Sequence, residues 1–183
     1  MTPRLAPLPR DGSPAVFLDR DGTLIEDRGN LSDPSQVVFY PRTHDAVRRL
    51  AARFALFIVT NQAGVGEGEI TLEEAHRVNA HVVRSLAVPF REIYVCPHLR
   101  ADNCECHKPK PHFPRRAERE HGIDLRRSFV VGDHPGDVEL AASVGARGIF
   151  VLTGHGARHR PDLKVPCDIV DGIGEAADRI LSL

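Results

Sequence analysis

Five short apolar runs recur along the chain, and most of them are followed by an amphipathic stretch. The runs span residues 15–19, 54–60, 92–96, 128–133 and 148–153. Strands that are apolar throughout are buried on both faces, which is typical of a parallel sheet with helices packed on each side. The sequence therefore predicts an α/β fold with a doubly wound parallel sheet.

The stretches between the runs have the spacing of amphipathic helices. They span residues 44–53, 71–86, 113–123 and 135–146, and two further segments, 168–170 and 173–183, close the chain. Thr71 and Glu74 have the capping-box spacing that starts a helix, and Gly122 is a residue type that commonly ends one. A chain of 183 residues fits one domain. We expect a single domain over 14–183 after a flexible, proline-rich leader over 1–13.

Composition narrows the class of protein. The apolar fraction of 42% and the charged fraction of 27% are ordinary for a soluble globular protein. No apolar run approaches the ~20 residues that a membrane span needs, and the first 14 residues lack the apolar core of a signal peptide. The net charge of −1 gives no indication of nucleic acid or an anionic membrane as a partner. We expect a cytoplasmic monomer.

Polar and charged residues gather where the apolar runs end. They are Asp19, Asp21, Thr60, Asn61, Gln62, Lys108, Asp133 and Asp137. Ligands of open α/β sheets bind at the carboxyl ends of the strands, so we expect these side chains to meet there. Bringing Asp19, Asp21 and Asp133 together would cost several kcal/mol of repulsion unless a cation neutralises them. A hard divalent ion with oxygen ligands, Mg²⁺ above all, fits such a site.

Each of these signals is weak by itself. Asp-x-Asp-Gly is often only a turn, because Asp and Gly both suit turn geometry, and a single lysine such as Lys108 is usually a solvated surface residue. A non-catalytic phosphate-binding or partner-binding module on the same fold is the alternative. Such a module would be expected to lack one of the acidic residues, whereas Asp19 and Asp21 are both present. The combination, in this order and at successive strand ends, favours a catalytic site.

A cluster of metal-binding residue types precedes Lys108. Cys96, His98, Cys104 and Cys106 form a C-x-H pair and a C-x-C pair with five residues between them. Without a secretion signal, clustered thiols more often bind metal than pair, and no C-x-x-C redox motif is present. Thiolate and imidazole suit Zn²⁺ in a closed tetrahedral site, while a disulfide and free thiols are the alternatives. Cys167 lies far along the chain and is expected to be an ordinary buried thiol.

Four segments together resemble a known family. "FLDRDGTL", "VTNQAGVG", "CHKPKP" and "VGDHPGD" resemble the four motifs of the haloacid dehalogenase superfamily, and the match runs from residue 15 to about 155. Within it the chain is similar to the small histidinol-phosphatase and heptose-bisphosphate-phosphatase group. The resemblance implies a Rossmann-like core. The gaps between the motifs leave no room for a cap domain, so we expect an open site bordered by the 26–40 loop and the cysteine loop.

The resemblance also implies a mechanism. Asp19 would be the nucleophile that forms an aspartyl-phosphate, and Asp21 would be the general acid and then the general base. Thr60 would hold a phosphoryl oxygen, and Lys108 would neutralise Asp19 and the transferring phosphate.

The metal ligands implied by the family are two sets. Asp19, Asp133 and the backbone carbonyl of Asp21 would hold Mg²⁺, with Asp137 either a ligand or a residue that orients one. Members of the group carry a zinc loop of the pattern seen at residues 96–106.

The substrate is less well defined, because the chain departs from the family at the substrate-binding positions. His107 replaces an arginine, and His134 stands where relatives often carry lysine. Further candidates for substrate contact are Asn61, Gln62, Asp27, Arg28 and Asn30. We expect a heptose bisphosphate as substrate, with histidinol phosphate as the alternative and a nucleic-acid 3′-phosphate as a third possibility that the lack of a basic stripe disfavours.

Overall fold

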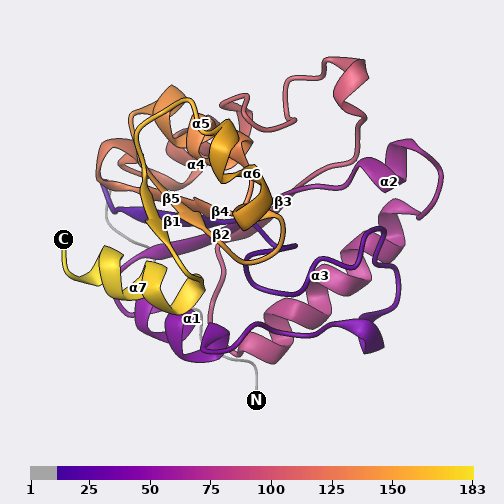
Figure 1. Cartoon of the computed structure of the whole chain (residues 1–183), viewed down its shortest axis with the longest axis horizontal. Helices are drawn as coiled ribbons and strands as arrows, with labels where there is room; N and C mark the ends of the chain where they lie inside the picture. Colours follow the sequence, from indigo (N-terminus) through magenta and orange to yellow (C-terminus); the bar gives the residue numbers. More distant parts are fainter. Residues whose placement is uncertain (1–11) are drawn as a thin grey trace.

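The computed structural model describes residues 12–183 and contains one six-stranded parallel sheet (Figure 1). Its strands are β1 Ala15–Leu18, β2 Ala55–Asn61, β3 Glu92–Cys96, β4 Phe129–Gly132, β5 Arg147–Val151 and β6 Asp168–Val170. They lie side by side in the order β3-β2-β1-β4-β5-β6, and every pair is parallel. The order reverses direction at β1, so β1 and β4 flank the point where doubly wound sheets bind ligands. The predicted fold class is confirmed.

Seven α-helices and four short 3₁₀ turns connect these strands in the described part of the chain. The helices are α1 Thr43–Ala51, α2 Ala63–Gly66, α3 Leu72–Leu86, α4 His112–His121, α5 Pro135–Val144, α6 Gly156–His159 and α7 Ile173–Leu181. The 3₁₀ turns are Pro34–Gln36, Arg100–Asp102, Leu125–Arg127 and Arg160–Asp162. The sequence did not predict α2 and α6, because each is a single turn too short to show a helical apolar period.

The sheet separates two apolar cores. Alternate residues of β1 point to opposite faces, so Val16 and Leu18 pack with α1, α3 and α7, while Ala15 and Phe17 pack with α4 and α5. Figure 1 shows these two groups of helices on opposite sides of the strands. All four β1 residues have no exposed surface. The residue that follows β1, Asp19, is therefore attached to a fully buried strand in the middle of the sheet.

Local sequence signals set the ends of the helices that border the site. Thr71 Oγ1 accepts from the Glu74 backbone N–H at 3.1 Å, and Glu74 Oε2 accepts from the Thr71 backbone N–H at 2.7 Å. These two hydrogen bonds form the predicted capping box. Helix α5 begins after His134, whose ring accepts from Gly136 N–H, and ends at Gly145 with φ +75°. The start of α5 is thereby fixed directly after β4.

No cap domain interrupts residues 12–183. Between β1 and β2 the chain forms only a loop with the 34–36 turn and α1, and between β2 and β3 only α2 and α3. Residues 1–11 of the predicted leader over 1–13 lie outside the described residues. Gly12, however, donates to Gly122 O at 2.8 Å and Ser13 bridges Ile123, so the folded domain includes both residues. None of the described helices has the length and apolar character to cross a membrane.

Candidate active site

A cavity of about 980 Å³ opens at the carboxyl ends of the strands. Twelve of the residues singled out from the sequence line it: Asp19, Asp21, Asp27, Asn30, Thr60, Asn61, Gln62, His107, Lys108, Asp133, His134 and Asp137. They come from the last residues of β2 and from the segments that follow β1, β2, β3 and β4. The topology therefore brings together side chains that are more than 100 residues apart in sequence.

Lys108 occupies the centre of the site. Its Nζ donates to Asp19 Oδ1 and Asp137 Oδ1, both at 2.7 Å, and to Val59 O at 3.0 Å. Burial alone would lower the pKa of Lys108, but Asp137 and Asp19 outweigh it and hold the pKa above its ordinary value. Lys108 is thus a permanent cation beside the carboxylate that follows β1.

Asp133 packs against two glycines, Gly22 and Gly154, and a side chain at either position would collide with its carboxyl group. A Cβ on Gly22 would come within 2.1 Å of Asp133 Oδ2, and one on Gly154 within 2.3 Å. Both glycines have positive φ, +79° and +56°. Asp133 Oδ2 accepts from His155 N–H at 2.7 Å. Burial raises the pKa of Asp133 to about 8, with a further contribution from the negative charge of Asp19.

Asp19, Asp133 and Asp137 offer carboxylate oxygens that lie within 4.8 Å of one another. Burial raises the pKa of Asp19 to about 6 in spite of Lys108, so the protein's own cations do not fully compensate this acidic cluster. Both oxygens of Asp137 are engaged, one by Lys108 Nζ and the other by His134 N–H at 3.1 Å. The donor set therefore fits a hard divalent cation between Asp19 and Asp133, with Asp137 orienting Lys108.

Gln62 links two of the predicted catalytic groups. Its Nε2 donates to Thr60 Oγ1 and to Asp21 Oδ2, both at 2.8 Å. Because Thr60 accepts this bond, its own hydroxyl proton is free to point into the cavity. Gln62 is 5% exposed, so in this structure it orients Thr60 and Asp21.

Asn61 and His107 fix the backbone beside Lys108. Asn61 Oδ1 accepts from Lys108 N–H at 3.2 Å, which ties the end of β2 to the lysine loop. The Nδ1 of His107 lies 2.8 Å from Lys108 O and 3.3 Å from Asn61 Nδ2. His107 lies on the cavity wall.

The loop after β1 contributes only part of the predicted substrate contacts. Asp27 lines the cavity and pairs with His155 at 3.1 Å, and Asn30 packs against Gly64 of α2. Arg28 instead pairs with Glu26 at 2.9 Å and does not line the cavity. Of the 26–40 loop that was expected to border the site, only Asp27, Gly29 and Asn30 line the cavity.

Sequence reasoning missed one wall of the cavity and two buried residues that lie behind it. The segment 155–164, with α6 and the turn that follows it, forms one wall and includes His155, His159 and Lys164. Arg20 and Asn79 lie behind Asp21, are 0% and 1% exposed, and hydrogen-bond to each other at 2.7 Å. A polar residue on the buried face of α3, beside Val78 and Val82, was the signal that could have identified Asn79.

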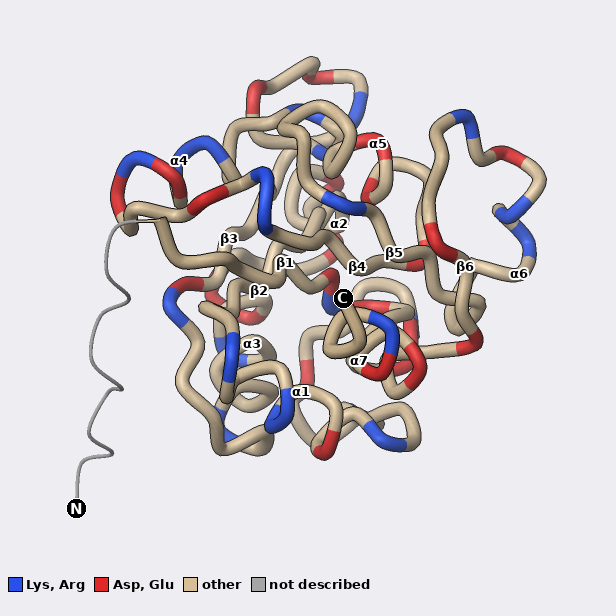
Figure 2. The backbone as a smooth tube through the Cα atoms, turned by 90° about the vertical axis from the view of Figure 1, so that its left-hand side faces the viewer, with Lys and Arg blue, Asp and Glu red and all other residues tan. Residues whose placement is uncertain are grey.

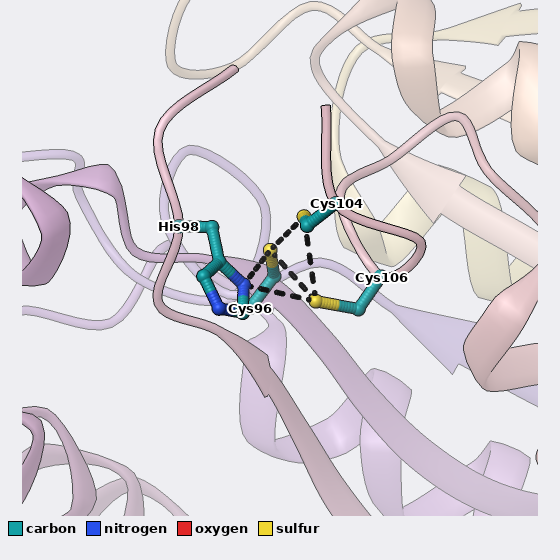
Figure 3. Close-up of side chains that lie close together, drawn as sticks. All are labelled: Cys96, His98, Cys104 and Cys106. Atoms are coloured by element: carbon teal, nitrogen blue, oxygen red, sulfur yellow. Dashed lines mark hydrogen bonds between the residues drawn. The ribbon is translucent and has the colours of Figure 1, made fainter. Parts of the chain in front are cut away.

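The four predicted zinc ligands form one cluster at the end of β3 (Figure 3). Their Sγ atoms and His98 Nδ1 lie within 4.8 Å of one another, and the sulfur pairs are separated by 3.1–3.6 Å. A disulfide would need about 2.05 Å, whereas sulfurs around a tetrahedral Zn²⁺ are roughly 3.8 Å apart. The arrangement is compatible with a four-coordinate metal. Cys167 lies outside the cluster and is half-buried.

The chain is similar to several known proteins. Residues 105–176 match the family described as HAD-hydrolase-like. A D-glycero-beta-D-manno-heptose-1,7-bisphosphate 7-phosphatase of Yersinia pestis is 38% identical over 154 residues, which cover 77% of this chain and 81% of that protein. The histidine biosynthesis bifunctional protein HisB of Campylobacter jejuni is 32% identical over 141 residues, 73% of this chain but only 40% of that longer protein.

The chain is also similar to a solved structure over most of its length. The D,D-heptose 1,7-bisphosphate phosphatase from B. bronchiseptica, complexed with magnesium and phosphate, superposes with a TM-score of 0.85 at 27% sequence identity. The superposition covers 92% of this chain and 98% of that one. The likeness therefore extends over the whole sheet and both helical layers.

Proposed function

The chain belongs to the haloacid-dehalogenase-like hydrolases, a group that includes phosphatases, and on this premise we propose that it hydrolyses phosphomonoesters through an aspartyl-phosphate on Asp19. One observation carries the proposal: buried Lys108 bridges Asp19 and Asp137 at 2.7 Å, at the switch point of the sheet. A carboxylate that must attack a phosphate dianion needs a fixed cation beside it, and Lys108 is that cation.

In the proposed reaction Asp19 attacks phosphorus while the bond to the leaving oxygen breaks. The electron pair of that bond stays with the leaving oxygen, which receives the proton of the Asp21 carboxyl. A water molecule then attacks the phosphorus, loses a proton to Asp21, and returns the carboxylate of Asp19. The Thr60 hydroxyl donates to a phosphoryl oxygen, and Lys108 balances the charge that spreads over the phosphoryl group.

Mg²⁺ is the proposed catalytic ion, held by Asp19, Asp133 and the carbonyl of Asp21. When bound it would neutralise the phosphoryl oxygens and keep Asp19 ionised as a nucleophile. The raised pKa values of Asp19 and Asp133 support this assignment, since both carboxylates lack compensation without a cation. Asp137 is proposed as the residue that orients Lys108, because both of its oxygens are already engaged.

The acidic cluster predicts how stability depends on pH and Mg²⁺. In the folded protein the pKa is about 6 for Asp19 and about 8 for Asp133, whereas the ordinary pKa of both carboxyls is 3.8. Between this ordinary value and about pH 8, the folded protein therefore binds more protons than the unfolded chain. The melting temperature of the Mg²⁺-free protein should therefore fall as the pH rises from about 6 to about 8. Millimolar Mg²⁺ should remove most of this fall, because it stabilises the ionised carboxylates.

Thermal unfolding at both pH values, with and without Mg²⁺, measures the effect. Asp133→Asn should be largely insensitive to pH and Mg²⁺, while Asp171→Asn, at an exposed site, serves as the control that behaves like wild type. A fall in melting temperature of the same size in Asp133→Asn would show that the dependence comes from other groups.

For the substrate we propose D-glycero-D-manno-heptose 1,7-bisphosphate, with release of the 7-phosphate, and histidinol phosphate as the alternative. The relatives at 31–38% identity with bisphosphatase names support the first, and HisB supports the second. The cavity adds a physical argument. Arg100 and Lys164 line it and are exposed, and in the described part of the chain neither forms an ion pair. A second phosphate would find cations there, whereas the ammonium of histidinol phosphate would be repelled.

A substrate panel separates these possibilities. We expect kcat/KM for the heptose 1,7-bisphosphate to exceed that for histidinol phosphate and for 3′-phosphorylated oligonucleotides by at least about tenfold, a difference of roughly 1.4 kcal/mol in transition-state binding. The measurement is phosphate release with each substrate at equal Mg²⁺. If histidinol phosphate ranked first, the substrate assignment would be overturned while the proposed chemistry on Asp19 would stand.

The 3′-phosphatase alternative is disfavoured by charge. In the part of the chain that the structure describes, Lys and Arg positions are interspersed with Asp and Glu positions (Figure 2) and do not gather into the basic stripe that favours binding of a phosphate backbone. We further propose that the enzyme works as a cytoplasmic monomer on a small phosphorylated metabolite. The cluster of Cys96, His98, Cys104 and Cys106 is proposed to hold a structural Zn²⁺.

A further inference from the structure

We propose that Arg20, together with Asn79, positions the catalytic carboxyl of Asp21 for proton transfer to the leaving group. The inference rests on the proposed function, because it assumes that Asp21 is the general acid. Arg20 Nε donates to Asp21 Oδ2 at 3.0 Å, and its second terminal nitrogen lies 2.7 Å from the same oxygen. The Arg20 side chain is completely buried.

Every hydrogen bond that orients the Asp21 carboxyl reaches one oxygen. Oδ2 accepts from Arg20 and from Gln62, whereas Oδ1 has no hydrogen-bond partner among residues 12–183. Without Arg20 the carboxyl would be held by Gln62 alone, and Gln62 also serves Thr60. A general acid contributes only when its carboxyl lies within hydrogen-bond reach of the leaving oxygen. Loss of Arg20 would therefore act on the protonation of the leaving group.

Arg20 is itself fixed from two sides. Its NH1 donates to Asn79 Oδ1 at 2.7 Å, and Asn79 is 1% exposed on the inner face of α3. The carbonyl of Arg20 accepts from the N–H groups of Leu24 and Ile25 in the turn that follows. Helix α3 thereby supports the acid through a chain of two hydrogen bonds, from Asn79 to Arg20 to Asp21.

A structural role alone does not account for this arrangement. Replacing a buried ion pair by apolar side chains of similar volume is often neutral or stabilising, so packing does not require an arginine here. Within the described residues Asp21 is the one carboxylate that lies within 4 Å of the guanidinium. The two guanidinium nitrogens that face Asp21 Oδ2 fix the orientation of the carboxyl with the proposed proton-transfer role.

The test compares two substrates that differ in their need for an acid. Phenyl phosphate has a poor leaving group, whereas 2,4-dinitrophenyl phosphate has one that departs without protonation. We expect Arg20→Met to lower kcat/KM for phenyl phosphate by about tenfold to a hundredfold, within the range that general acids contribute, and for the dinitrophenyl ester by no more than a few-fold. Arg20→Lys, which keeps one donor, should fall between wild type and Arg20→Met.

Controls separate this proposal from the function on which it rests. Asp21→Asn should show the same leaving-group dependence and a larger loss; if it does not, the proposed role of Asp21 fails whatever Arg20 does. Arg77→Met, at an exposed position of α3, should match wild type with both esters. Equal losses on both esters in Arg20→Met, or no loss on either, would overturn the positioning role. Should Arg20→Met not fold, Asn79→Leu replaces it, with several-fold loss expected for phenyl phosphate alone and a uniform or absent loss overturning the proposal.

Discussion

Asp19→Asn is expected to lower Mg²⁺-dependent phosphate release by on the order of 10⁴-fold or more, the scale at which loss of a covalent nucleophile acts in other enzymes. The side chain is buried and paired with Lys108, and the neighbouring carboxylates of Asp133 and Asp137 are held in other contacts. Asp137 is held by Lys108 and by the start of α5, and Asp133 by the backbone of His155. An amide at position 19 would keep the shape and remove the nucleophile.

Two measurements check this prediction. Steady-state phosphate release gives the size of the loss. Acid quenching of a reaction with ³²P-labelled substrate should trap a hydroxylamine-sensitive label on wild type and none on Asp19→Asn, as an acyl phosphate requires. Asp171→Asn is the matched control, because it makes the same change at an exposed site and should keep both signals. Substantial turnover by Asp19→Asn would rule out the covalent mechanism.

Much of this fold was predictable because its strands are apolar on both faces. The runs at 15–19 and 54–60 became β1 and β2 with ends shifted by only one residue, since a fully buried strand leaves a continuous signal. The strand order could not be predicted in the same way. Register and order depend on which faces pack together, as in the pairing of Val16 with Leu56 on one side and with Phe129 on the other.

The site was predictable where a residue type was chemically unusual at a strand end. Asp19 and Asp133 met these conditions, whereas Lys108 lies well beyond the end of β3 and was identified only in combination with the other motifs. The structure brings all three into one cavity. The wall at 155–164 was not predictable, because this mostly polar and charged stretch has neither a helical nor a strand apolar period. Arg20 was hidden for another reason: its burial depends on α3, which comes about 60 residues later in the chain.

Removal of the proposed zinc ion is expected to lower kcat/KM by about 10²-fold or more, although we propose no contact between this ion and the reacting groups. The loop that carries the four ligands has little core of its own, since residues 100–103 are all exposed. Metal binding can supply the folding free energy of such a segment. Lys108 follows Cys106 by two residues, and losing one preorganised stabilising donor costs about 10²–10³ in rate. An unfolded loop would misplace Lys108 in this way.

The experiment should separate zinc from Mg²⁺ and one cysteine from another. Cys106→Ser should lose bound zinc, measured by atomic emission, together with most activity at saturating Mg²⁺, while Cys167→Ser should retain both because it lies outside the cluster. Two contacts would persist without zinc: Lys110 Nζ to Cys104 O at 2.7 Å, and Asn61 Oδ1 to the Lys108 N–H at 3.2 Å.

These two contacts set the condition under which the prediction fails. If they sufficed to hold the loop, Cys106→Ser would lose its metal and keep wild-type kcat/KM, and the cluster would then have no part in placing Lys108. If the metal is needed, the loss of activity in Cys106→Ser should arise from the misplacement of Lys108. Lys108→Met would then reduce activity in wild type but add little to the loss already present in Cys106→Ser, since residues that act as a unit are not additive.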